Sequence, residues 1–471
     1  MRKFSEIEKT GDDFICAVCT SSTTEPIYTC QNQSILSLLH TNFHHEVPPH
    51  SNLHSVKIPQ PNSYKRVIFL IFFFILLTSF PFCLKNPSPP SIPLPSPEND
   101  VDSLKGKDQY SAKTCDVFNG TWVPYLEEPY YTNGSCPWII DQQNCMKFGR
   151  PDQEFLQWRW KPDDCELPLF DAVEFLELVR GKSLAFLGDS VGRNQMNSLV
   201  CLLGKVAYPE DVSEKYYNNT EYFKRFIYPE YNFTIGVLWA PFLVKTRETD
   251  PKVYSGNSRM NLYLDEPNEG WSTEVEKFDY VIVSAGQWFF RPLMLHEGGR
   301  LIGCSKCMEK NITELTPHYI YRRAFRTVFR TLLGLELYKG VTFMRTFSPA
   351  HFENGAWNDG GSCERSRPFG RGEVEKATYQ YIWDMNSIQV EEFRAAEELG
   401  KQKGLQFRMM DTTEAMFMRP DGHPNFYGHS PHRNMTIADC VHWCLPGPID
   451  TWNEFLMYIL RTLQRPLDGK L

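Results

Sequence analysis

One uncharged apolar run, over residues 67–84, divides the chain and limits what the rest of it can fold into. A helix of this length rises about 1.5 Å per residue and spans roughly 27 Å, enough to cross the apolar core of a bilayer. The run lies too far from the first residue for a cleaved signal peptide, and its FLIFFFILL stretch lacks the polar face of a surface helix. We therefore expect a single transmembrane signal anchor at residues 67–84.

The charges beside the anchor predict its orientation. Lys65 and Arg66 precede it, whereas Lys85 is the one cation that follows closely. The positive-inside rule then places residues 1–66 in the cytosol and the remainder of the chain across the membrane. This is the arrangement of a single-pass type II membrane protein.

The segments on either side of the anchor differ in composition from the rest of the chain. Residues 1–66 are rich in Ser, Thr, His and Asn, which predicts a disordered cytosolic tail. Their CxxC, at Cys16 and Cys19, lacks the second pair that a zinc site needs. Residues 85–112 predict a proline-rich lumenal stem. The folded lumenal domain is expected at residues 113–465.

The residues beyond the anchor have the features of a secretory lumen. Ten of the fourteen cysteines lie there, where an oxidising compartment lets disulfides persist. Sequons in the same portion predict N-glycosylation at Asn119, Asn133, Asn218, Asn232, Asn311 and Asn434. The formal net charge of −8 and the lack of a Lys/Arg-rich stretch argue against nucleic acid as a partner.

Short apolar runs alternate with amphipathic stretches through the predicted lumenal domain. The runs end in Gly or Ser and predict buried parallel strands at residues 182–188, 278–286 and 340–348. The amphipathic stretches predict helices at residues 193–203, 319–336 and 387–404. Strands that alternate with helices predict an α/β fold with a mostly parallel sheet. Residues 205–275 fit this rhythm poorly and are expected to form a minor lobe.

A Gly-Asp-Ser sequence ends the first predicted strand, and ligands of α/β sheets bind at the carboxyl ends of strands. Met196, Leu199, Val200 and Leu203 form the apolar face of a helix that begins just after Ser190. Ser190 is then either a nucleophile, whose acyl-transfer intermediate is stabilised by the helix N-terminus, or only the N-cap of that helix.

A nucleophilic serine needs a base, and the base needs a group that orients it. Asp439 and His442 are three residues apart, so one turn can present both side chains to a serine on another loop. Cys440 and Cys444 bracket the pair, and a structural histidine near two disulfides is the alternative interpretation. Four further histidines compete for the role of base: His351, His423, His429 and His432.

Four stretches together resemble the plant trichome birefringence-like family of Golgi polysaccharide O-acetyltransferases, which are related to the GDSL/SGNH esterases: GDSVGRNQ, TFSPAHFENGAWNDGGSC, MRPDGHP and DCVHWCLPGPIDTWNEFL. The resemblance implies an SGNH/GDSL-like three-layer α/β/α sandwich. It implies a catalytic triad of Ser190, His442 and Asp439. It also implies disulfides that join Cys115 to Cys165, Cys136 to Cys201, Cys145 to Cys444 and Cys363 to Cys440, and it leaves Cys304 and Cys307 unassigned.

The groups around the expected acyl intermediate are less well marked. The sequence SAGQWFF, at residues 284–290, departs from the Gly-His-Trp-Trp type of sequence that is usual in the family. The expected oxyanion donors and supporting residues are Gly286, the Ser190 N–H, Asp189, Arg193 and Asn194. Candidate aromatic walls of an acceptor groove are Trp288, Phe289, Phe290, Trp357 and Trp443.

The expected reaction is a double displacement, in which an acetyl group moves from a donor to Ser190 and then to a sugar hydroxyl. The motifs resemble most the xyloglucan-acetylating branch of the family. Alternatives are an acetyltransferase for mannan or xylan, a polysaccharide acetyl-esterase, and a non-catalytic wall polysaccharide-binding protein. We expect a Golgi membrane location and an acetyl donor such as acetyl-CoA or an acetylated intermediate. Neither a bound cofactor nor a metal is expected.

Overall fold

The structure, a computed structural model, describes residues 115–248, 259–307, 309–430 and 437–464. These residues belong to one compact unit, Lys107–Leu471. The predicted cytosolic tail with Cys16 and Cys19, the predicted anchor at 67–84 and the predicted stem at 85–112 lie outside the described residues. Within the described ranges, no helix is long and apolar enough to cross a membrane.

A mixed sheet forms the centre of the described residues, with seven strands in the order β13-β12-β9-β3-β6-β5-β4. Five successive strands, counted from the edge strand β13, are parallel: β13 (Gln406–Met410), β12 (Val341–Arg345), β9 (Tyr280–Ser284), β3 (Ser183–Gly188) and β6 (Phe233–Trp239). Two antiparallel strands extend one edge, β5 (Lys224–Tyr228) and β4 (Glu210–Asp211). The predicted strands at 182–188, 278–286 and 340–348 are confirmed as β3, β9 and β12.

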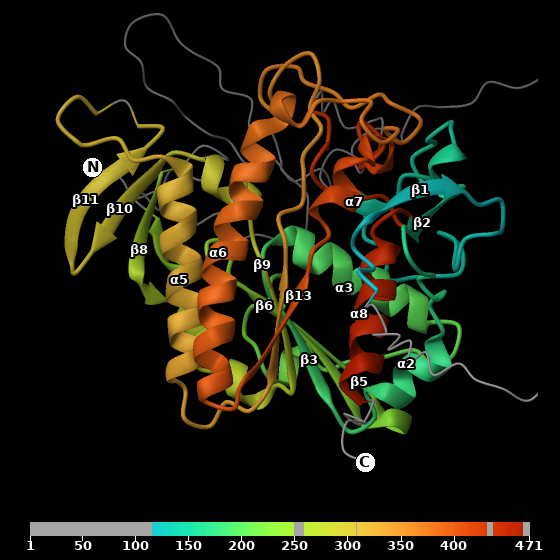
Figure 1. The fold of residues 1–471 in the computed structure, drawn as a ribbon, viewed down its shortest axis with the longest axis horizontal. Helices are drawn as coiled ribbons and strands as arrows, with labels where there is room; N and C mark the ends of the chain where they lie inside the picture. Colours follow the sequence, from blue (N-terminus) through green and yellow to red (C-terminus); the bar gives the residue numbers. More distant parts are fainter. Residues whose placement is uncertain (1–114, 249–258, 308, 431–436, 465–471) are drawn as a thin grey trace, which may run out of the picture. The chain divides into compact units, whose positions relative to one another are not determined.

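Helices cover both faces of this sheet (Figure 1). One face carries α5 (Pro317–Gly334) and α6 (Gln380–Gln402), and the other carries α2 (Ala172–Leu178), α3 (Ser190–Leu203) and α8 (Asp450–Gln464). Side chains alternate along β3, so that Leu184 and Phe186 join the core under α3 and α8, whereas Ala185 and Leu187 join the core under α5 and α6. The α/β fold, the sheet of mostly parallel strands and the predicted helices at 193–203, 319–336 and 387–404 are thus confirmed.

A second, four-stranded sheet lies beside α5, in the order β11-β10-β8-β7 among the described strands. Its strands are β7 (Val244–Glu248), β8 (Met260–Pro267), β10 (Leu293–Glu297) and β11 (Arg300–Ser305), and the one-turn helix α4 (Glu269–Ser272) follows β8. The predicted bounds of the minor lobe, residues 205–275, are therefore wrong. Strands β4 to β6 belong to the central sheet because Phe233, Ile235 and Val237 face its buried core.

The N-terminal part of the described chain has little regular structure. Strands β1 (Gly120–Pro124) and β2 (Trp158–Pro162) pair antiparallel, and the short helix α7 (Thr413–Phe417) lies against β1. The structure joins the cysteines as the resemblance implies: Cys115 to Cys165, Cys136 to Cys201, Cys145 to Cys444 and Cys363 to Cys440. It also joins Cys304 to Cys307, a pairing that the sequence left open.

The predicted glycosylation sites can be located in part. Exposed side chains belong to Asn119, Asn133, Asn218, Asn232 and Asn311. Asn434 and His432 lie outside the described residues. The exposed positions leave room for a glycan, and glycosylation itself stays a prediction.

Candidate active site

Ser190 lies where β3 turns into α3, at the carboxyl end of the parallel strands. Gly188 makes this turn possible: its φ is +149°, and a Cβ there would lie 1.5 Å from the carbonyl oxygen of Ser284 on the neighbouring strand. Asp189, rather than Ser190, is the N-cap of α3, and its carboxylate accepts from the Val191 N–H at 3.0 Å. The capping interpretation of Ser190 is therefore wrong, and its hydroxyl is left for other partners.

Ser190, His442 and Asp439 form one hydrogen-bonded chain. His442 Nδ1 lies 2.8 Å from Asp439 Oδ2, and His442 Nε2 lies 2.7 Å from Ser190 Oγ. A carboxylate can only accept, so the Nδ1–H donates to Asp439, and the Ser190 hydroxyl donates to the free lone pair of Nε2. The side chains of His442 and Asp439 are 12% and 19% exposed, which leaves the pair open to a small substrate.

Asp439 is held by its own turn as well as by the imidazole. Its Oδ1 accepts from the backbone N–H groups of Val441 and His442, at 3.1 and 3.0 Å. Burial raises the pKa of Asp439, but the charge of His442 and these hydrogen bonds hold it well below its ordinary value. Burial likewise lowers the pKa of His442, and the charge and hydrogen bond of Asp439 outweigh this, so that the pKa of His442 is raised.

Two of the predicted oxyanion donors are engaged elsewhere. The Gly286 N–H donates to Asp189 Oδ2 at 2.9 Å, because the buried Asp189 carboxylate bridges the ends of β3 and β9. The Asn194 side chain accepts from the Trp443 N–H at 2.8 Å and donates to the Trp443 carbonyl at 3.2 Å. Gly286 and Asn194 are thus corrected from oxyanion donors to groups that hold the Asp189 carboxylate and the Trp443 backbone, respectively. Of the predicted donors, the Ser190 N–H and Arg193 remain.

Arg193 lies one turn along α3 from Ser190. Its guanidinium lies 5.3 Å from the centre of the Trp239 ring and donates to the Glu221 carbonyl at 3.2 Å, while its buried Nε has no partner. Burial lowers the pKa of Arg193. Its positive charge opposes protonation of His442, which places the two groups within electrostatic reach of one another.

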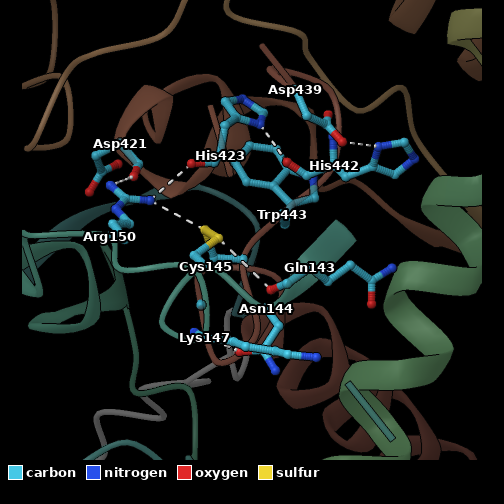
Figure 2. Close-up of a disulfide and its surroundings, with 12 residues drawn as sticks. Gln143, Asn144, Cys145, Lys147, Arg150, Asp421, His423, Asp439, His442 and Trp443 are labelled. Carbon is cyan, nitrogen blue, oxygen red and sulfur yellow. Dashed lines mark hydrogen bonds and ion pairs between the residues drawn. A yellow bond between two sulfur atoms is a disulfide. The ribbon is translucent and has the colours of Figure 1, made fainter. Parts of the chain in front are cut away.

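Two of the competing histidines, His423 and His351, are buried, and Figure 2 shows His423 beside the His442 backbone. His423 Nδ1–H donates to the carbonyl of His442 at 2.7 Å, and the His423 ring stacks on Trp443 with 4.1 Å between the ring centres. His351 Nδ1 lies 2.7 Å from His423 Nε2. Burial lowers the pKa of His423, and it lowers the pKa of His351 to about 4. Among the described residues, neither ring forms a hydrogen bond with Ser190: His423 holds the His442 carbonyl, and His351 contacts His423. His429 Nδ1 lies 3.3 Å from the carbonyl of its neighbour Ser430.

The Cys145–Cys444 disulfide fixes the other side of the His442 loop (Figure 2). Arg150 lies against it and donates to Cys444 Sγ at 3.3 Å, to the His423 carbonyl at 2.9 Å and to the Asp421 carbonyl at 2.6 Å. A buried ion pair between Arg419 and Asp421 completes this layer. The loop that carries His442 is therefore tied by covalent and charged contacts.

Sequence reasoning missed Gln142, which comes from the N-terminal part of the described chain. Its side-chain nitrogen lies 3.0 Å from Asp439 Oδ2 and 3.1 Å from His442 Nδ1. Gln142 belongs to the short 3-10 turn Asp141–Gln143. No motif marks this position, since the contact joins residues 297 apart in the chain.

Aromatic side chains near Ser190 differ in part from the predicted walls. Phe289 and Trp443 are fully buried in the core, whereas Trp288 and Phe290 are half-buried and Trp357 is 44% exposed on a loop. Three half-buried rings, which we call the aromatic platform, lie at the carboxyl ends of β6 and β9: Tyr222, Trp239 and Trp288. Trp239 is 5.3 Å from Tyr222 and 5.9 Å from Trp288 between ring centres. Trp239 pairs with Gly188 across the sheet, which brings the platform beside the Ser190 turn.

Among the described side chains, no group of three or more His, Cys, Asp or Glu could hold a metal ion.

An α/β sandwich with a serine at a strand-to-helix turn, hydrogen-bonded to a histidine from near the C-terminus, has the architecture of the GDSL/SGNH-like acyl-esterase class. Two family models match the chain accordingly. The model of the "GDSL/SGNH-like Acyl-Esterase family found in Pmr5 and Cas1p" matches residues 167–459, and that of the "PMR5 N terminal Domain" matches residues 113–166. The chain therefore belongs to this PC-esterase family, and the two models meet between β2 and α2.

Curated plant proteins are similar to the chain over most of its length. Protein trichome birefringence-like 19 of Arabidopsis thaliana is 50% identical over 78% of this chain and 85% of its own length. Xyloglucan O-acetyltransferase 4 of Populus trichocarpa is 45% identical over 78% of this chain and 86% of its own length. Xyloglucan O-acetyltransferase 2 of Arabidopsis thaliana is 42% identical over 74% of this chain and 83% of its own length.

Proposed function

We propose that this protein transfers acetyl groups to hydroxyls of a hemicellulose, most specifically xyloglucan, through an acetyl-Ser190 intermediate. The observation that carries the proposal is the continuous hydrogen-bonded chain from Ser190 through His442 to Asp439, with separations of 2.7 and 2.8 Å. Such a chain is the arrangement that activates a serine hydroxyl for attack on an acyl group.

In the first half of the reaction, Ser190 Oγ attacks the carbonyl carbon of the acetyl donor, and His442 Nε2 takes the hydroxyl proton. Asp439 stabilises the imidazolium that results. The bond between the acetyl carbon and the donor then breaks, and His442 returns the proton to the leaving group. Ser190 is left as an acetyl ester, and the donor leaves without its acetyl group.

In the second half, a sugar hydroxyl attacks the acetyl carbon and gives its proton to His442 Nε2. The ester bond to Ser190 breaks, and the proton moves to Ser190 Oγ, which restores the free serine. The negative charge on the acetyl oxygen lies near the N-terminus of α3, where the Ser190 N–H and the helix dipole stabilise it. The positive charge of Arg193, one turn along α3, acts in the same direction.

The acceptor is assigned from the site and from the relatives together. The aromatic platform of Tyr222, Trp239 and Trp288 offers half-buried rings beside Ser190, and the faces of sugar rings pack on such surfaces. Relatives that are 45% and 42% identical are named xyloglucan O-acetyltransferases, which favours xyloglucan over mannan or xylan. The proposal includes a type II anchor in the Golgi membrane, a lumenal, N-glycosylated domain, and an acetyl donor used as a substrate.

The test is the intact mass of the purified protein after exposure to acetyl donor, with and without xyloglucan oligosaccharide. We expect one added acetyl group on Ser190, which disappears when the oligosaccharide is supplied and reappears on the sugar. Ser190→Ala should abolish both signals. Ser183→Ala is the matched control, because Ser183 lies at the opposite end of β3 and bonds to Asp279.

A hydrolase would give a different result in the same assay. The family model carries the word esterase, so acetate release is measured in parallel. Acetate without acetylated sugar would identify an acetyl-esterase and overturn the transferase proposal. Full acetyl transfer by Ser190→Ala would overturn the assignment of the nucleophile.

A further inference from the structure

We propose that Gln142 is a positioning residue of the active site: its side-chain amide donates to the Asp439 carboxylate and, through it, holds the His442 ring in the geometry needed to accept the Ser190 proton. This inference rests on the proposed function, because it assigns Gln142 a role in the same acyl transfer. It adds the N-terminal part of the chain, matched by a separate family model at 113–166, to the catalytic machinery.

The amide of Gln142 completes a triangle of polar atoms. Gln142 Nε2 lies 3.0 Å from Asp439 Oδ2 and 3.1 Å from His442 Nδ1, and these two atoms are 2.8 Å apart. The nitrogen faces the carboxylate because the amide oxygen would be repelled by it. Asp439 Oδ2 thus accepts from His442 and Gln142, while Oδ1 accepts from two backbone N–H groups. These four donors fix the orientation of the Asp439 carboxylate.

The backbone around Gln142 is fixed to the His442 loop on both sides. The Leu445 N–H donates to the Gln143 carbonyl at 2.8 Å, and Cys145 is bonded to Cys444. The Gln143 side chain accepts from Asn197 on α3 at 2.9 Å. These contacts hold the turn that carries Gln142 against both the histidine loop and the helix of Ser190. The amide of Gln142 is therefore placed by the fold.

The position of the amide also affects the charge of His442. The N–H groups of Gln142 carry partial positive charge and lie against His442 Nδ1, so they oppose protonation of the imidazole. Among the charged groups that act on this ring, Asp439 and Asp189 favour the imidazolium, and Arg193 disfavours it. The buried His423 also interacts unfavourably with a charged His442. Loss of the Gln142 amide should therefore raise the pKa of His442 further. A carboxylate in its place should raise it most.

The test compares Gln142→Met, Gln142→Glu and, as a control at an exposed position of the same N-terminal part, Gln153→Met, all in the full-length protein. For Gln142→Met we expect kcat to fall about 10- to 100-fold, because Asp439 and His442 are displaced from Ser190. KM should change little, because the residues that bind the substrate stay intact. In Gln142→Glu, the rising limb of kcat/KM against pH should move to higher pH by about one unit or more. Gln153→Met should keep the wild-type kcat and pH profile, because its side chain is exposed and makes no capping hydrogen bond to the short helix it precedes.

Two results would overturn the inference: a wild-type kcat in Gln142→Met, or an unmoved pH limb in Gln142→Glu. If Gln142→Met does not fold, the isosteric Gln142→Glu decides alone. Ser190→Ala in the same series separates this inference from the proposed function. An inactive Ser190→Ala beside a wild-type Gln142→Met refutes only the role of Gln142, whereas an active Ser190→Ala refutes the triad itself.

Discussion

The two parts of the described chain that the family models separate are stabilised by different interactions. Residues 167–459 build the central sheet, and two clusters of buried apolar side chains fill the layers on its faces. In the described residues before 167, the strands are limited to β1 and β2, and three disulfides begin there. The sandwich is held by apolar burial, whereas the N-terminal part adds three disulfides to the apolar side chains, such as Trp122 and Trp160, that it buries in the same core.

The active site draws on both parts. Ser190, His442 and Asp439 belong to the sandwich, whereas Gln142 and Cys145 reach them from the N-terminal part. The sandwich places the reacting atoms at the end of the sheet, and the N-terminal part limits the motion of the loop that carries two of them. Stability of the fold and precision of the site can therefore be changed separately.

The largest expected effect comes from a change within the sandwich. Asp439→Asn should lower kcat by roughly 10³- to 10⁴-fold, because an amide does not stabilise the imidazolium and favours the wrong tautomer of His442. The melting temperature should fall as well, because the lowered pKa of Asp439 shows that its carboxylate stabilises the folded state, so kcat is measured below the unfolding temperature of the variant. Acetyl transfer and thermal unfolding are measured on Asp439→Asn and on Asp171→Asn, where asparagine can still cap α2. A kcat within tenfold of wild type in Asp439→Asn would exclude Asp439 from the triad.

The next effect tests the link between the two parts. Paired Cys145→Ser and Cys444→Ser should lower the free energy of unfolding by about 2–4 kcal/mol and also lower kcat, because the His442 loop is released. Paired Cys115→Ser and Cys165→Ser should lower stability alone, since that disulfide joins residues within the N-terminal part. Urea unfolding and kcat are measured for both pairs. Equal loss of kcat in the two pairs would remove the distinction between fold and site.

The smallest effect concerns the contact between α8 and the N-terminal part. Glu454 is 4% exposed and accepts from the Tyr130 hydroxyl, its Oε2 has no partner, and burial raises its pKa from 4.5 to about 7. The folded state therefore holds this proton more tightly than the unfolded state does. Stability from this group is fully present below pH 4.5 and is lost as the pH rises to about 7, by up to about 3 kcal/mol.

Glu454→Gln should remove that loss, because glutamine does not ionise. The variant should then gain stability relative to wild type as the pH rises from 5 to 8, and urea midpoints at the two pH values measure the gain. The exposed Glu398→Gln is the control, for which no such gain is expected. Parallel pH dependence of wild type and Glu454→Gln would show that Glu454 is already ionised in the folded state. Asp450, whose pKa burial raises to about 6, contributes in the same direction and stays in both proteins.

The sequence predicted the layers of the sandwich because apolar periodicity records which side chains a core buries. Strand β3 is apolar on both faces since both are covered by helices, and α5 shows its buried face as a repeat. The region at 205–275 does not show this periodicity, because the edge strand β4 and its neighbour β5 are partly exposed and carry polar residues. Its strands were therefore not expected in the central sheet. The apolar run FTIGVLW at 233–239 forms β6.

The sequence predicts the site residues that lie in recognisable motifs. It does not predict the contacts that form only when the chain folds. Ser190, His442 and Asp439 lie in two motifs, and the structure brings them within 2.8 Å of one another along the chain of contacts. The roles of Gly286 and Asn194 depend on which neighbour takes their hydrogen bonds, and spacing does not report that. Gln142 and Trp239 lie at the site because tertiary packing brings distant segments of the chain together, so no local sequence pattern marks them.

The disulfide between Cys145 and Cys444 also sets an order of events during synthesis. Its cysteines are 299 residues apart. The disulfides Cys115–Cys165 and Cys136–Cys201 join residues only 50 and 65 apart, so both of their cysteines are synthesised much earlier. At typical elongation rates Cys145 waits roughly 15–60 s for its partner to be made. The histidine loop can be locked only when nearly the whole chain exists, so an interrupted chain carries the serine but not the assembled site.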